Sequence, residues 1–242
     1  MADQRNWLTT YNYVQNNPIV RIDPTGAIDD YYDEELNYLG NDGKGEGIRI
    51  VSSENVETVK TNLNGSETTE EQRKAATKNS DSYEVIEPLS LRYNEERYGT
   101  MLRRSTAENK EKAKWIVVNL DEKTISLEAA IGYVENSHQM KIPFANVEGS
   151  TSVRAVRGSN GRKRIAGIVH THPPGTGLFG VSTEDGTSDG DKSAAQDINA
   201  PVYAIGPKQK IYKVDQNGKT SNFPIDTRGL LEDALATKGG KK

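Results

Sequence analysis

The second half of the chain alternates runs of β-forming residues with stretches of helix formers, and this order restricts the possible folds most strongly. Turn residues separate the expected strands, which cover residues 114–120, 123–134, 139–147, 151–156, 164–172, 201–206 and 210–215. Helix formers dominate residues 92–112, 191–200 and 228–238. This order predicts an α/β (α+β) fold in which helices flank one mixed, curved β-sheet.

The first half of the chain is more polar, and it predicts an extended, loop-rich N-terminal segment. Residues 28–47 are acidic and rich in turn residues, which favours an exposed connector with little core. Residues 48–59 have the composition of a strand, whereas the polar residues 62–82 fit a loop, a solvated helix or a disordered link. We therefore expect a linker with short β elements, flexible in part, over residues 28–92 and a folded domain over residues 93–242.

Charge and composition exclude several classes of function. The 242 residues carry a formal net charge of −4, so the chain lacks the basic excess of proteins whose main partner is nucleic acid or an anionic membrane. No apolar run approaches the roughly 20 residues that span a bilayer, and the N-terminal residues do not form a signal peptide. Because there is no cysteine, any metal must be held by His, Asp or Glu.

A short motif near the N-terminus gives the first family resemblance. Residues 11–26 predict a short strand closed by tight turns, because Pro fixes φ and Asn and Gly tolerate positive φ. Their order resembles the motif that ends the core of RHS/YD-repeat proteins, with matches at Tyr11, Tyr13, Asn17, Pro18, Arg21, Ile22, Asp23, Pro24 and Gly26. The resemblance implies that residues 1–27 end a secreted RHS shell and that the chain beyond is its variable toxin cargo.

The chain has three histidines, and two of them lie at the end of an expected strand. His170 and His172 are separated by one residue, so their side chains project from the same face of a strand over 164–172. Two imidazoles presented in this way can bind one metal ion, although such a pair can also be merely packed at a strand end. A carboxylate at the start of the following helix could supply a third ligand and leave the fourth position to water.

The residues after the histidines give the second resemblance. The order His-x-His-Pro, a glycine-rich loop and Ser-x-x-Asp is similar to the signature of the JAB/MPN (JAMM) metalloprotease family. The resemblance implies that His170, His172 and Asp191 bind Zn²⁺ and that Ser188 stabilises the oxyanion or positions the water. Ser182 and Asp185 also fit Ser-x-x-Asp, but the helix and strand that follow Asp191 have the expected length.

The family also uses a glutamate as general base, before a strand next to the metal. Glu111 is the leading candidate, and Glu108 and Glu128 are alternatives; each can also be an ordinary surface glutamate. His138 is expected in an exposed turn without a role at the site. Trp115 and Phe144 are expected in the core.

Together, these features predict a zinc-dependent peptidase or isopeptidase at the tip of an RHS-type polymorphic toxin. The resemblance implies secretion within a larger carrier, delivery into a target cell, a cognate immunity protein and a protein substrate. Two alternatives stay open, namely a catalytically inactive JAB-fold binding module and a His-metal nuclease toxin. The acidic net charge of −4 weighs against the nuclease alternative, although residues 154–164 form a local basic patch.

Overall fold

The computed structural model describes residues 29–44, 47–86, 99–108, 110–130, 147–148, 154–156, 159–172, 186–206, 210–223 and 227–241. The strands are β1 (Asp30–Asp33), β2 (Tyr38–Asn41), β3 (Ile48–Val51), β4 (Asp81–Val85), β5 (Ala113–Asn119), β6 (Thr124–Ala129), β7 (Val147–Glu148), β8 (Arg154–Val156), β9 (Lys163–Thr171), β10 (Val202–Ile205), β11 (Ile211–Val214) and β12 (Thr220–Phe223). The helices are α1 (Val56–Lys60), α2 (Glu70–Lys78), α3 (Gly99–Glu108), α4 (Asp189–Ile198) and α5 (Thr227–Gly239), with single 3-10 turns at Ser53–Asn55 and Gly65–Glu67. None of the helices in this described part is long and apolar enough to cross a membrane.

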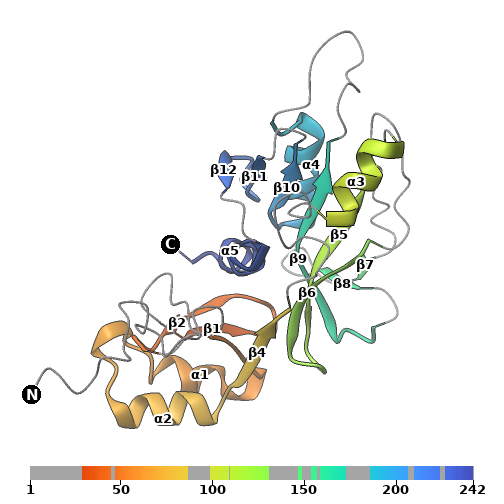
Figure 1. Cartoon of the computed structure of the whole chain (residues 1–242). Coiled ribbons are helices and arrows are strands. Elements are labelled where there is room, and N and C mark those ends of the chain that lie inside the picture. The colour runs from red at the N-terminus through yellow and green to blue at the C-terminus, as the bar shows by residue number, and fades with distance from the viewer. Residues whose placement is uncertain are drawn as a thin grey trace, which may run out of the picture.

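These strands form one mixed sheet, in the order β12-β11-β10-β9-β5-β6-β4-β3-β1-β2 (Figure 1). Pairing is antiparallel except between β9 and β10, between β4 and β6, and between β1 and β3. The short strands β7 and β8 lie beside this path, where β8 pairs with β9. The result is the mixed α/β architecture that the sequence predicts.

Strand β5 shows how the sheet separates two layers of core. Its alternate residues Trp115 and Val117 belong to a cluster that includes Ala195 and Ile198 of α4. Ile116 and Val118 lie in another cluster, with the apolar side of α5. Trp115 is 2% exposed, which confirms its predicted place in the core. Helix α4 therefore covers one side of the central strands and α5 the other.

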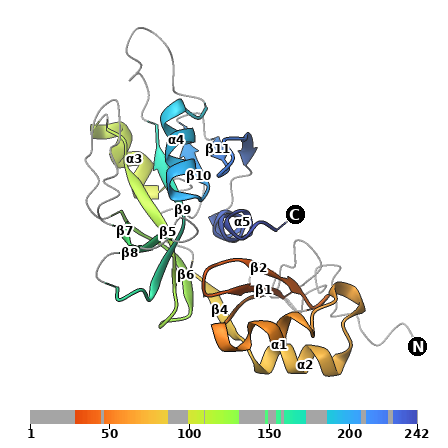
Figure 2. The same ribbon diagram turned by 180° about the vertical axis from the view of Figure 1, so that it is seen from behind.

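The N-terminal part is more ordered than the sequence predicts. Tyr31, Tyr32 and Leu36 are buried, so the expectation of an exposed connector with little core is wrong for residues 29–44. Gly239 of α5 packs directly against the Tyr32 ring and the Leu36 carbonyl, whereas Tyr31 is buried in a cluster with Val51, Val59 and Ala76. Both views show α5 between strands β1 and β2 and the β10–β12 end of the sheet (Figures 1 and 2).

Two further N-terminal segments differ from a simple strand or link. The strand expected over 48–59 stops at Val51, and a turn closed by the Asn55 N–H and the Ser52 carbonyl (2.9 Å) leads into α1. The polar segment 62–82 contains α2, so the helix is the one of the three predicted alternatives that the structure shows. Thr69 and Gln72 begin α2 with a reciprocal capping box.

In the second half, the expected strands over 114–120, 151–156, 164–172, 201–206 and 210–215 are observed as β5, β8, β9, β10 and β11. Strand β6 covers the first part of 123–134, and β7 begins at the last residue of 139–147. The three expected helices appear as α3, α4 and α5. Residues 131–134, 139–146 and 151–153 of the expected strands, the RHS-like motif, His138 and Phe144 lie outside the described residues.

Candidate metal centre

Strand β9 carries both histidines to the site. It lies between β5 and β10, and its residues from Ile165 onward are buried. Ile168 faces the cluster beneath α4, and alternation along the strand turns His170 and His172 to the same side. The two Nε2 atoms lie 2.9 Å apart. The predicted same-face arrangement of the imidazoles is therefore present.

Helix α4 supplies the carboxylate. Ser188 is its N-cap, and its hydroxyl accepts the Asp191 N–H (3.1 Å). In return, the Ser188 N–H donates to Asp191 Oδ2 (2.6 Å), which turns the carboxylate back toward the helix start. Asp191 Oδ1 then lies 3.1 Å from His170 Nε2, and Oδ2 lies 3.8 Å from His172 Nε2.

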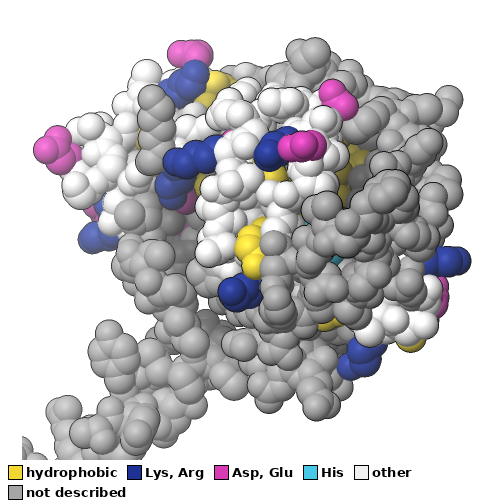
Figure 3. Space-filling model, turned by 90° about the horizontal axis from the view of Figure 1, so that it is seen from above, with side chains coloured by type: hydrophobic (Ala, Val, Ile, Leu, Met, Phe, Trp, Pro, Cys, Tyr) yellow, Lys and Arg dark blue, Asp and Glu magenta, His cyan; other side chains and the backbone are white. Residues whose placement is uncertain are grey.

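The three side chains are enclosed by protein. His170 is 1% exposed, His172 4% and Asp191 8%. In the view from above, little histidine surface is visible, in agreement with these values (Figure 3). Such a site strengthens electrostatic interactions, because water is largely excluded from it.

The electrostatics of the site couple the histidines to nearby carboxylates. Burial lowers the pKa of His170, but the negative charge and hydrogen bond of Asp191, with a further contribution from Glu111, raise it above the ordinary value of 6.5. Burial raises the pKa of Asp191, yet His170, the Ser188 N–H and His172 together hold it well below its ordinary range. The carboxylate is therefore ionised at neutral pH.

Of the candidate bases, Glu111 is the one that the β5–β9 register brings to the histidines. Ala113 pairs with His170, and the Thr171 N–H donates to the Lys112 carbonyl (3.0 Å). One more step in this antiparallel register places Glu111 opposite His172 on the same face. The charge of Glu111 also helps to raise the pKa of His170, after the larger effect of Asp191.

The other two glutamates are engaged in ion pairs. Glu108 Oε2 lies 2.6 Å from Lys112 Nζ at the end of α3. Glu128 lies on β6, where both its oxygens accept hydrogen bonds from Lys163 Nζ (2.9 Å each). Their surroundings therefore fit the structural interpretation that the sequence left open for each.

The donor set fits a divalent metal ion. One ligand atom from each of His170, His172 and Asp191 lies within 4.8 Å of the others, so this buried triad could hold one ion. Two imidazoles and one carboxylate leave a fourth tetrahedral position open, as in catalytic rather than structural zinc sites. The competing pair Ser182 and Asp185 lies outside the described residues.

The buried pair Thr171 and Lys112 lies beside this centre and has no predicted role. The Lys112 N–H donates to Thr171 Oγ1 (3.1 Å). This contact depends on the register of β5 and β9. The only related signal in the sequence is the position of Thr171 between the two histidines.

Fold and site thus define a mixed α/β protein with a buried His-His-Asp group able to hold a metal ion. No protein-family model matches the chain, and no curated protein is significantly similar to it. The RHS and JAB/MPN resemblances therefore stay predictions from the motifs alone.

Proposed function

We propose that residues 93–242 form a JAB/MPN-like zinc hydrolase that cleaves peptide or isopeptide bonds. One observation carries the proposal. Three potential ligands converge in a buried site, and the β5–β9 register brings a further carboxylate, Glu111, to the same face. A buried structural histidine would also use Asp191 as an ion-pair partner (3.1 Å), so the further acid Glu111 is what favours a catalytic site over a structural pair.

In this proposal, His170, His172 and Asp191 hold Zn²⁺. When bound, the ion would lower the pKa of a coordinated water and polarise the scissile carbonyl. Glu111 accepts the proton of the attacking water and delivers it to the leaving amine. Ser188 donates its hydroxyl to the developing oxyanion, in addition to its observed role as the cap of α4.

The proposal also includes a biological setting, which rests on the motif over residues 11–26. We propose that the chain is the toxic tip of an RHS-type effector, secreted within its carrier shell and delivered into a target cell. A cognate immunity protein would protect the producer, and the substrate would be a protein.

The test uses the full chain with Zn²⁺ and two sets of probes, quenched linear peptides and peptides joined through a lysine side-chain amide. Glu111→Gln should lower kcat by about 10²- to 10⁴-fold, because it removes the general base. Zinc content should stay the same. The matched control Glu128→Gln alters another candidate glutamate and should leave kcat unchanged.

The alternatives give different results. Zinc binding without cleavage of either probe set would favour an inactive JAB-fold module. Cleavage of plasmid DNA or RNA that requires His170 would replace the peptidase with a nuclease.

A further inference from the structure

We propose that Thr171, the residue between the two histidines, is a positioning residue that fixes Glu111 at the metal centre through Lys112. The inference rests on the proposed function, because it takes Glu111 as the general base. It assigns a role to a buried side chain that does not itself face the metal.

The contact that carries the inference is a pair of hydrogen bonds between two residues. The Thr171 N–H donates to the Lys112 carbonyl (3.0 Å), and the Lys112 N–H donates to Thr171 Oγ1 (3.1 Å). Both backbone polar groups of Lys112 are thus bound by one residue of β9. Thr171 is 0% exposed and Lys112 is 8% exposed, so water competes little for these bonds.

The second bond departs from a regular sheet. In an antiparallel ladder, two hydrogen-bonded residues exchange both bonds through their backbones. Here the side-chain hydroxyl of Thr171 accepts the Lys112 N–H (3.1 Å). The chain before β5 is therefore placed by a side chain, and a residue without a hydroxyl at position 171 would leave the Lys112 N–H without this acceptor.

A second anchor holds the same segment from the opposite direction. Lys112 Nζ pairs with Glu108 at the end of α3 (2.6 Å), and the Lys110 N–H donates to the Ser105 carbonyl (3.1 Å). Glu111 therefore lies between two residues that are bound to α3 and β9.

Proton transfer requires this support, because a general base must lie within about 2.6–3.2 Å of the atom that it deprotonates. A displacement of about 1 Å can lower the rate about 100-fold. Removing the Thr171 hydroxyl should therefore affect the chemical step more than metal binding, since His170 and His172 keep their backbone positions in β9.

The test compares Thr171→Val, which removes the hydroxyl at nearly constant shape, with Thr171→Ser, which keeps it. Both are made in the full chain and in the Glu111→Gln background, and folding is checked by thermal melting. Thr171→Val should lower kcat about 10- to 100-fold with unchanged zinc affinity, and Thr171→Ser should restore most of the loss. In the Glu111→Gln background, Thr171→Val should have no further effect, since the two residues act in one step.

An equal loss from Thr171→Val in both backgrounds, a loss of zinc affinity, or no loss of kcat would overturn the inference. If the wild-type chain cleaves nothing, the proposed function fails separately. Crystal structures of the zinc-soaked variants then test the positioning alone. The Glu111 carboxylate should move in Thr171→Val and keep its place in Thr171→Ser, and the same position in both would contradict the role of Thr171.

Discussion

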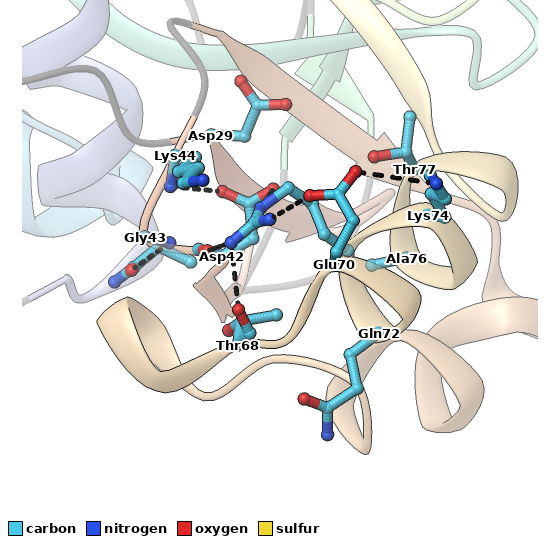
Figure 4. Close-up of polar contacts among 12 residues, drawn as sticks. Asp29, Asp42, Gly43, Lys44, Thr68, Glu70, Gln72, Lys74, Ala76 and Thr77 are labelled. Carbon is cyan, nitrogen blue, oxygen red and sulfur yellow. Dashed lines mark hydrogen bonds and ion pairs between the residues drawn. The ribbon is translucent and has the colours of Figure 1, made fainter.

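The carboxylates of Asp42 and Asp191 are both buried, but they have different partners. Asp42, which follows β2, accepts hydrogen bonds from the Tyr31 hydroxyl (3.3 Å) and the Lys44 N–H (3.0 Å). Arg73 of α2 completes its surroundings with an ion pair (3.6 Å). Figure 4 shows Asp42 with Lys44, close to Thr68 and Glu70. Asp191 instead faces two imidazoles whose Nε2 atoms lie 2.9 Å apart.

The difference distinguishes a cluster that is satisfied by its own groups from one that could hold a metal ion. Around Asp42, the Tyr31 hydroxyl and the Lys44 N–H donate to the carboxylate. The Arg73 guanidinium, which cannot lose its proton in a protein, adds its charge at 3.6 Å without a hydrogen bond from Nε. In the Asp191 cluster, each imidazole can offer a nitrogen lone pair to a metal ion once its proton is removed, and the carboxylate offers further oxygen lone pairs. In the Asp42 cluster, contacts between opposite charges and between donors and acceptors stabilise the fold without a ligand. In the Asp191 cluster, the lone pairs point to one place, and this arrangement becomes favourable when a cation lies between them.

The largest effect is expected on the free energy of unfolding, when the Asp42 cluster is disrupted. Arg73→Met should lower the free energy of unfolding by about 3–5 kcal/mol, because it leaves the buried Asp42 charge without its partner. Chemical denaturation measures this change. Zinc stoichiometry should be unaffected under conditions in which the variant is folded.

Lys60→Met is the matched control, since Lys60 and Glu57 form an exposed ion pair (3.8 Å) on α1. It should change the free energy of unfolding by less than about 1 kcal/mol. Equal effects of the two substitutions would show that the Asp42 cluster contributes no more than a surface pair.

A smaller effect is expected in the Asp191 cluster, where it concerns the pH dependence of zinc affinity. His170 must lose its proton to bind the ion, and the charges of Asp191 and Glu111 raise its pKa above 6.5 despite its burial. Zinc affinity should therefore be constant above that raised pKa and fall about tenfold per pH unit below it, for one competing proton. Calorimetric titrations at several pH values measure this curve.

Glu111→Gln should shift the onset of this fall to lower pH, because it removes one of the charges that raise the pKa of His170. An affinity that does not change between about pH 5 and 8 would mean that imidazole does not bind the ion.

The smallest expected effect concerns Ser188. As the N-cap of α4, its hydroxyl should contribute about 1 kcal/mol to stability, which Ser188→Ala would remove; Ser188→Gly would lose only a few tenths. Stability and kcat measured for both variants separate the two roles. A similar loss of kcat in both supports the oxyanion role, and a loss that follows stability alone would reduce Ser188 to a cap.

Local patterns in the sequence were sufficient for the part of the site that depends on local geometry. Alternation along one strand places His170 and His172 on the same face. Ser188 and Asp191 have the spacing of a capping box, so the helix start itself fixes the carboxylate. Both relations span only two or three residues, which is why they can be predicted without knowledge of the fold.

Relations between distant segments could not be predicted in this way. Glu111 comes opposite His172 only when the register of β5 with β9 is continued two residues before Ala113. Tyr31 and Tyr32 are buried although the residues around them in the sequence are acidic. Tyr32 becomes part of the core because Gly239, near the end of the described chain, packs against it. Residue patterns over a short window contain no information about such contacts.

The central claim is that His170, His172 and Asp191 bind one divalent cation and leave a coordination position open near Glu111. A crystal structure of the zinc-soaked chain, with anomalous scattering measured at the zinc edge, tests it most directly. The account predicts one strong anomalous peak between the two Nε2 atoms and the Asp191 carboxylate, with Glu111 as the nearest further acid. An ion bound elsewhere, or imidazoles turned away from each other with no ion between them, would contradict it.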